Sequence, residues 1–269
     1  MSQHVPHHLK RRGTPPAGSI PEALDQFAAE VRFYREIAPV MSSTGIRVPA
    51  CYRAEDSGDG TLLELEDLSA WQPGADPAAA AAVLGTMHRR WAGEAPARWP
   101  WLRPVGAAID LVERLYARTW PQLAARGDLP SGLAEFGARM LGRVTAAEYG
   151  IAAAGPLTLV HGDAQARNMR TGPDGEVALL DWEDVSAAPG ALDLGWLLTA
   201  STDPARWDEV IAVYGGPDAC AGATMADALA QVLPAVMVQG FFSMSDEPAG
   251  SPAAMAWAHR LDEALRRLR

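Results

Sequence analysis

The segment TLVHGDAQARNMRTGPDGEVALLDWED, residues 158–184, places three oxygen-bearing side chains just after apolar runs. Asp163 and Asn168 stand five residues apart in the loop after the first run, and Asp181 ends a later run. Neighbouring strands lie side by side, so we expect these side chains to converge. Carboxylate and carboxamide oxygens suit Mg²⁺, which otherwise takes water and phosphate oxygens. Asn168 and Asp181 are therefore candidate metal ligands, and Asp163 is left to accept a proton from an attacking hydroxyl group.

Loop aspartates also serve as turn formers and helix caps, and either carboxylate alone is compatible with that role. The three residues together, at this spacing and followed by ALDLGWLL, favour a chemical site. Glu183 and Asp184 are better explained as a solvated turn, although contact with a metal or a cationic substrate is an alternative. His88 and Trp196 fall on apolar helix faces, which predicts core packing for both.

Local patterns predict the N-terminal elements that must position these residues. An extended segment covers about residues 4–12. A helix over residues 19–39 follows, with Ser19 and Glu22 in a capping box and Pro39 as its stop. The segment VPACYRAEDSGDGTLLELEDL then predicts a β-hairpin around a polar Gly/Asp turn.

After residue 68 the pattern becomes mainly helical. AWQPGADP predicts a linker, and the quoted segment predicts a strand over 157–161 and a hairpin that turns at GPDG. Helices are expected over residues 77–92, 105–126, 132–153, 191–200, 204–214, 223–243 and 252–268. The fold class is therefore α+β with two lobes: a small, partly β N-lobe over 1–68 and a mostly helical C-lobe over 69–269. A cleft between lobes is a natural ligand site.

HGDAQARN followed by LLDWED resembles the catalytic loop and metal-binding segment of the aminoglycoside phosphotransferase and choline kinase superfamily, small-molecule relatives of the protein kinases. The resemblance implies a bilobal protein-kinase-like fold with Asp163 as catalytic base. It makes Asn168 and Asp181 the magnesium ligands and gives His161 a structural role in orienting the loop. APGALDLGWLL is similar to the family segment whose aspartate, Asp193 here, braces the catalytic loop as a buried group satisfied by backbone amides.

Lys10 is the single lysine beside 22 arginines. An ammonium is a compact charge and a guanidinium a wide planar fork, so Lys10 is a candidate for a site where arginine would not serve. A solvated basic arm is the alternative. EVRFYREIAP resembles the N-lobe helix of the superfamily, whose glutamate, Glu30 here, pairs with the lysine that holds the α- and β-phosphates of ATP. TLLELEDL resembles the hinge, where backbone groups from Glu66 to Leu68 would bind the adenine edge.

The N-terminus departs from the pattern of the superfamily. Nine residues precede Lys10, too few for two strands and a Gly-rich loop, and G-x-G-x-x-G occurs nowhere in the chain. Three interpretations follow. The protein begins upstream of Met1 and this N-lobe is truncated, the chain is a shortened variant that covers ATP in another way, or it binds ATP poorly.

The net charge of −10 disfavours a nucleic-acid partner and tilts the acceptor towards a cation. No apolar run of the length that crosses a membrane occurs, and the N-terminus lacks the apolar centre of a signal peptide, so we expect a cytoplasmic protein without a membrane partner. The oligomeric state is not predicted.

These observations together predict an ATP- and Mg²⁺-dependent O-phosphotransferase, a small-molecule kinase. Its acceptor would be a hydroxyl group of an antibiotic, an amino alcohol or another natural product, and GTP stays open as the donor. An inactive pseudokinase with a binding or regulatory role is the alternative. A metal-dependent phosphohydrolase is a third interpretation.

Overall fold

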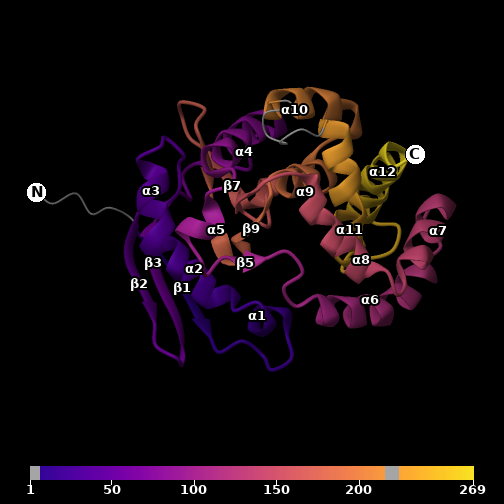
Figure 1. Cartoon of the computed structure of the whole chain (residues 1–269), viewed down its shortest axis with the longest axis horizontal. Coiled ribbons are helices and arrows are strands. Elements are labelled where there is room, and N and C mark those ends of the chain that lie inside the picture. The colour runs from indigo at the N-terminus through magenta and orange to yellow at the C-terminus, as the bar shows by residue number, and fades with distance from the viewer. Residues whose placement is uncertain (1–6, 216–223) are drawn as a thin grey trace, which may run out of the picture.

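The computed structural model describes residues 7–215 and 224–269. Figure 1 shows a small β-sheet with short helices at the N-terminal side of the molecule and a larger group of helices at the C-terminal side. Two further small sheets lie between these parts. The structure confirms the predicted α+β class and its kinase-like, bilobal arrangement. The exact division at residue 68 stays a prediction.

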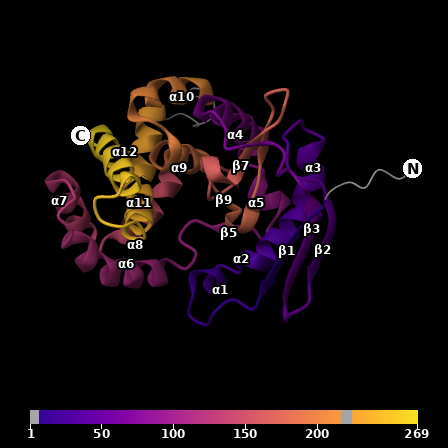
Figure 2. The ribbon, with the colours of Figure 1, turned by 180° about the vertical axis from the view of Figure 1, so that it is seen from behind.

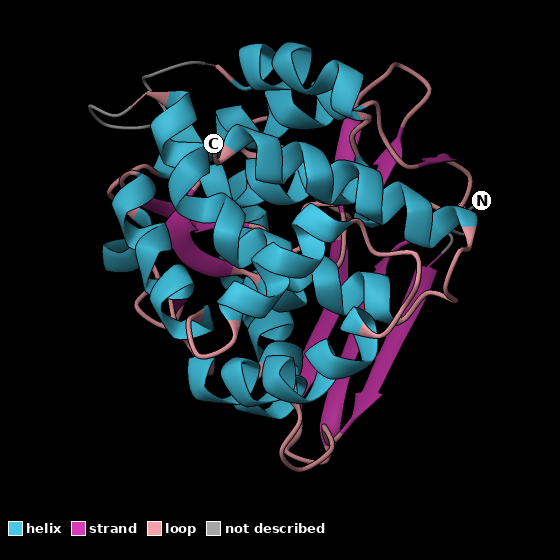
Figure 3. Ribbon diagram, turned by 90° about the vertical axis from the view of Figure 1, so that its right-hand side faces the viewer, coloured by secondary structure: helices cyan, strands magenta, loops and turns pink. Residues whose placement is uncertain are grey.

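The N-terminal sheet has the order β1-β3-β2 and is antiparallel. It consists of β1 (His7–Gly13), β2 (Cys51–Asp56) and β3 (Gly60–Glu66), and Figure 3 shows these strands as the longest of the molecule. The predicted hairpin is therefore confirmed. Lys10 pairs with Leu63 in the register of β1 and β3, which places it midway along β1.

The single helix predicted over residues 19–39 is wrong in two respects. The segment is divided into α1 (Ile20–Ala23), α2 (Gln26–Arg32), a π-helical turn (Phe33–Ile37) and α3 (Ala38–Ser42). Asp25 interrupts it with a left-handed backbone, φ 48°. Pro39 does not end it, because Pro39 lies in the first turn of α3, where its missing N–H costs no hydrogen bond.

The C-terminal part contains eight α-helices of seven residues or more among the described residues. They are α4 (Pro77–Trp91), α6 (Ile109–Ala124), α7 (Ser131–Met140), α8 (Val144–Gly150), α9 (Ala191–Ser201), α10 (Trp207–Tyr214), α11 (Met225–Ser245) and α12 (Pro252–Arg267), with the short α5 (Ala95–Arg98) after α4. The helix predicted over residues 132–153 is two helices, because Gly142 takes a left-handed φ of 72° between α7 and α8. Residue 223, the first of another predicted helix, lies outside the described residues.

Two three-stranded sheets carry the loops of interest. One has the order β4-β7-β8, from β4 (Gln72–Pro73), β7 (Met169–Thr171) and β8 (Val177–Leu179). The other has the order β5-β9-β6, from β5 (Arg103–Pro104), β6 (Leu157–Val160) and β9 (Ser186–Pro189). The predicted linker AWQPGADP thus contains a strand, because pairing with β7 satisfies its backbone.

Helix α11 forms the centre of the helical part, as Figure 2 shows from behind. It is long and apolar enough to cross a membrane, but 61% of its apolar window is buried inside the fold. It packs against α9, α12 and α8, so its apolar surface is explained by core packing. Strand β6, which leads into the loop with Asp163, packs against α4, α5 and β9.

Candidate active site

Lys10 on β1 and Glu30 on α2 form the ion pair that the sequence predicted. Lys10 Nζ lies 2.7 Å from Glu30 Oε2 and 2.5 Å from Asp181 Oδ1. Burial alone would lower the pKa of Lys10, but the charges and hydrogen bonds of Glu30 and Asp181 outweigh it and raise that pKa above its ordinary value. Lys10 is therefore a fixed cation between α2 and the segment that contains Asp181.

Asn168 and Asp181 lie next to one another because the backbone N–H of Leu180 donates to the Asn168 carbonyl, at 2.9 Å. Asp181 has a left-handed backbone, φ 62°. The chain therefore leaves the extended conformation of β8 at this residue and enters a 3₁₀ turn, Trp182–Asp184. Carboxylate oxygens of Glu30, Asp181 and Glu183 also lie within 4.8 Å of one another. These oxygen donors fit a hard divalent cation such as Mg²⁺.

Six of the seven predicted site residues line one cavity of about 620 Å³. They are Lys10, Glu30, Glu66, Leu68, Asn168 and Asp181. Backbone groups from Glu66 to Leu68 were predicted to bind the adenine edge. The backbone N–H of Glu66 is not free to do so, because it already donates to the Ala50 carbonyl at 2.8 Å. Among the described residues, nothing accepts a hydrogen bond from the backbone N–H of Leu68. The Tyr34 hydroxyl, in the same lining, is buried with no partner within the described chain.

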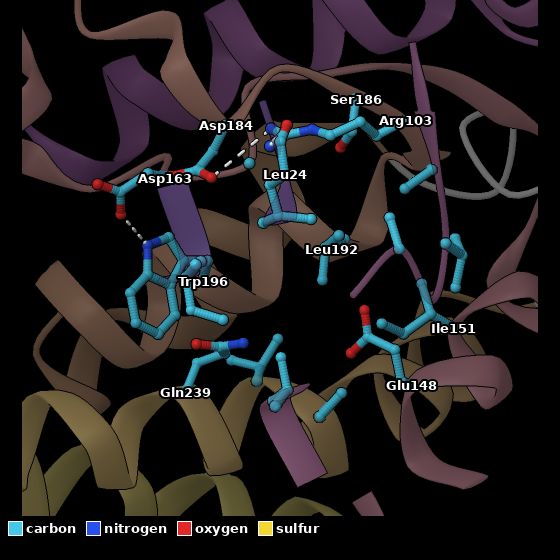
Figure 4. A pocket seen from close by; sticks show the side chains of 18 of the residues that line it. Leu24, Arg103, Glu148, Ile151, Asp163, Asp184, Ser186, Leu192, Trp196 and Gln239 are labelled. Atoms are coloured by element: carbon cyan, nitrogen blue, oxygen red, sulfur yellow. Dashed lines mark hydrogen bonds and ion pairs between the residues drawn. The ribbon is translucent and has the colours of Figure 1, made fainter. Parts of the chain in front are cut away.

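Asp163 lines a second cavity, of about 420 Å³, and is hydrogen-bonded to Asn168 in the wall of the first. Asp163 Oδ1 accepts hydrogen bonds from Trp196 Nε1 at 2.6 Å and from Gln165 Nε2 at 2.5 Å. Its Oδ2 accepts from Asn168 Nδ2 at 2.7 Å, which leaves the carboxamide oxygen of Asn168 for a metal. Figure 4 shows the Asp163 carboxylate above the Trp196 indole at the edge of this cavity. The Asp163–Asn168 hydrogen bond thus joins the two cavities.

The catalytic loop is held from behind by Asp193 at the start of α9. Asp193 is fully buried, and its carboxylate accepts the backbone N–H groups of His161 at 2.7 Å and Gly162 at 2.9 Å. Nε2 of the buried His88 lies 3.0 Å from the same carboxylate. These bonds confirm the brace expected at Asp193 and the core position of His88. His161 spans the loop in turn, donating from Nε2 to the Leu180 carbonyl at 2.8 Å.

Glu183 and Asp184 do not form a solvated turn, so that expectation is wrong. Glu183 faces Arg12, at 3.2 Å, and Lys10, at 3.8 Å. Asp184 accepts from Gln26 Nε2 at 2.6 Å and lies 3.6 Å from Arg103 Nη2. The partial burial of both carboxylates is offset by cations, which are Lys10 and Arg12 on β1 for Glu183 and Arg103 on β5 for Asp184.

Sequence reasoning missed Arg103, which connects the two lobes. Its guanidinium donates to the carbonyls of Leu24 at 2.9 Å and Glu183 at 3.0 Å, and it is largely buried. No periodicity marks a residue in a two-residue strand, so the sequence carried no signal for it. Trp196 was also missed as a site residue. Its spacing of three from Asp193 on a helix was a usable signal, because both then face the catalytic loop.

Comparison with known proteins bears on the family and the fold of the chain. Residues 19–232 match the model of a family described as "Phosphotransferase enzyme family". Choline kinase LicA from Streptococcus pneumoniae is 17% identical, with a TM-score of 0.58 over 100% of this chain and 87% of that one. A structure of LicA in complex with AMP is 15% identical, with a TM-score of 0.57 over 97% and 83%.

An aminoglycoside phosphotransferase from Alicyclobacillus acidocaldarius is 18% identical, with a TM-score of 0.54 over 97% of this chain and 84% of its own. At these identities the structures show the shared fold. No curated protein matches the chain by sequence.

Proposed function

Because the chain belongs to the phosphotransferase enzyme family, we propose that it transfers the γ-phosphoryl group of ATP to a hydroxyl group of a small molecule. The observation that carries this proposal is the junction of the two cavities at Asp163 and Asn168. One cavity holds a fixed cation and oxygen ligands, as a nucleotide site requires. The other brings its contents to a carboxylate, as an acceptor site requires.

Each residue then has a definite task. Lys10, held by Glu30, contacts the α- and β-phosphates, and Leu68 offers its backbone N–H to the adenine edge. Asn168 and Asp181 hold Mg²⁺, which would neutralise charge on the phosphates. Asp163 accepts the proton of the attacking hydroxyl group. Its carboxylate is already oriented by Trp196 and Asn168, so little reorganisation is needed at the moment of reaction.

The proposal also covers the donor nucleotide, the acceptor and the location of the enzyme. The AMP complex of LicA supports an adenine nucleotide, with GTP as a second donor to be compared. The acceptor is small enough for a 420 Å³ cavity, and choline and aminoglycosides are named as substrates of the neighbouring structures. We propose a cytoplasmic enzyme that needs neither a membrane nor a nucleic acid.

A pseudokinase is the second candidate, and the lack of a G-x-G-x-x-G motif favours it. The presence of Asp163, Asn168 and Asp181 in one arrangement supports the active enzyme instead. A chain without chemistry has little use for all three.

Incubation with Mg·ATP and a library of hydroxylated small molecules tests the proposal, with mass spectrometry as the readout. We expect a product one phosphoryl group heavier from the native chain. Asp163→Asn should reduce its rate by roughly 100-fold or more while Mg·ATP still binds, because a general base contributes about that factor. Asp174→Asn, a change of the same type at the exposed hairpin tip, should keep full activity.

Retained turnover in Asp163→Asn would remove the role given to this residue. Binding of Mg·ATP without any product would establish the pseudokinase. Rapid phosphate release without an acceptor would establish the phosphohydrolase.

A further inference from the structure

The cavity beside Asp163 has largely apolar walls. They come from the α1–α2 region, α6, the 3₁₀ turn Ile151–Ala154, α9 and α11, and include Leu24, Val112, Ile151, Leu192, Val236 and Phe242. Two charged side chains of the cavity wall, Asp184 and Arg103, already pair with one another. Asp184 accepts from Gln26 and pairs with Arg103, whose remaining N–H groups go to backbone carbonyls. An occupant therefore meets hydrocarbon over most of its surface.

Glu148 on α8 is a charged side chain of the same wall that has no such partner among the described residues. Figure 4 shows its carboxylate directed into the cavity, on the opposite side from Asp163. No cationic side chain in the described part of the chain forms an ion pair with it, and the backbone of Gly106 only partly offsets its burial. Burial raises the pKa of Glu148 above its ordinary value, and the Gly106 N–H offsets this only in part.

A partly buried carboxylate without a counter-charge is unfavourable in the protein alone. A cationic group on the occupant would remove that penalty and favour the ionised form. Such charge-assisted hydrogen bonds are among the strongest that a side chain can make.

We propose that Glu148 selects the acceptor, an amphipathic amino alcohol whose protonated amine and reactive hydroxyl group are separated by an apolar body. The amine binds Glu148, the apolar body packs against the cavity walls, and the hydroxyl group reaches Asp163. This assignment rests on the proposed function, because it gives Asp163 the role of proton acceptor.

The transfer balances without another reactant. The acceptor oxygen forms a bond to the γ-phosphorus as the bond to the β,γ-bridging oxygen breaks, and ADP leaves with that electron pair. The hydroxyl proton goes to Asp163. The products are a phosphomonoester, which keeps its amine at Glu148, and ADP.

A polyhydroxylated acceptor fits this cavity less well. Each additional hydroxyl group facing Leu192, Val236 or Phe242 would lose its water without gaining a partner. Gln239 and Ser186 are the neutral polar side chains left in the wall with no hydrogen bond to another described residue. The chemistry of the walls therefore favours one amine and few hydroxyl groups.

Matched probes test the proposal. One series is the linear α,ω-amino alcohols from butyl to decyl, and the other is the 1-alkanols of the same lengths. ADP formation with Mg·ATP gives kcat/KM for the native chain, for Glu148→Gln, and for Glu135→Gln, which changes an exposed glutamate on α7. The native chain and Glu135→Gln should prefer the amino alcohols by about tenfold or more. Glu148→Gln should lose that preference while its Mg·ATP binding stays unchanged.

Equal use of both series by the native chain, or a preference that persists in Glu148→Gln, would overturn the inference. So would a chain that binds Mg·ATP and phosphorylates a neutral or polyhydroxylated library compound but no amino alcohol. In each of these results the proposed function stands. If the native chain bound no Mg·ATP, or transferred a phosphoryl group to none of the compounds, the proposed function itself would be overturned.

Discussion

At the scale of single residues, the site depends on groups that orient Asp163. Trp196 donates its indole N–H to Asp163 Oδ1 while its ring lies half-buried 5.8 Å from that of Trp257. A carboxylate that must accept a proton from one direction gains from donors that fix it in the others. In the proposed mechanism Trp196 is thus a positioning residue, and it keeps part of the core role predicted for it.

Replacement of Trp196 by Phe tests this positioning role. The ring packing is largely kept and the hydrogen bond is lost, so we expect kcat to fall roughly tenfold, which corresponds to about 1.4 kcal/mol. Mg·ATP binding should not change. Trp101→Phe is the matched control, because Trp101 donates its indole N–H to Glu36 on the surface at 2.7 Å. Equal kcat values for the two variants, measured by ADP formation, would contradict the role.

At the scale of elements, the catalytic loop depends on a close approach between Gly162 and the 3₁₀ turn. Gly162 has φ 85°, and a Cβ atom there would lie 2.2 Å from the Asp184 carbonyl oxygen. That distance is far inside any allowed contact, so glycine is required by space as well as by conformation. The loop between β6 and β7 is thereby held against the metal-binding segment.

Gly162→Ala should lower the free energy of unfolding by more than about 2 kcal/mol, from conformational strain and from the clash. Gly175→Ala isolates the first contribution, because Gly175 has φ 81° with open space around it. That control should lose only about 1 kcal/mol. Urea denaturation measures both values, and equal losses would show that the contact with Asp184 has no energetic role.

Sequence patterns predicted these elements where the signal is local. The β-hairpin of β2 and β3, the cap that Ser19 provides for the N–H of Glu22, and the spacing of Asp163, Asn168 and Asp181 can all be read from neighbouring residues; the reciprocal half of the capping box does not form, because Glu22 accepts from Gly18 instead. The strand β4 and the π-helical turn could not, because pairing with β7 and stacking of Phe33 on Trp182, at 4.0 Å, stabilise them. The contacts of Arg103 and Glu148 likewise exist only once distant segments are packed together.

At the scale of the whole molecule, buried Asp193 connects the catalytic loop to the helical core through His88. Burial raises the pKa of Asp193, but the hydrogen bond and charge of His88 and the contacts with His161 outweigh it and lower that pKa below its ordinary value. A group with a depressed folded pKa stabilises the fold above its unfolded pKa. The contribution is lost as the pH falls through the folded pKa.

We therefore expect Asp193→Asn to unfold more easily than the native chain at pH 7, by roughly 3 kcal/mol, since its amide would face N–H donors. The difference should begin to shrink below about pH 4, where Asp193 becomes protonated in the unfolded chain, and should be lost as the pH falls through the lower pKa of the native carboxylate. Chemical denaturation across this pH range checks the sign, with Asp174→Asn as the exposed control. A difference that stays constant from neutral to acid pH would contradict the assignment.

The central claim is that residues of both lobes bind one nucleotide. Thermal unfolding with and without Mg·ATP tests this claim most directly. A ligand at about 100 times its Kd adds roughly 2.7 kcal/mol, which should raise the Tm by roughly 5–10 °C for a chain of this size. The account predicts a rise that needs Mg²⁺, that Asp181→Ala abolishes and that Asp174→Ala retains. No rise, or the same rise in Asp181→Ala, would contradict the nucleotide site at Lys10, Asn168 and Asp181.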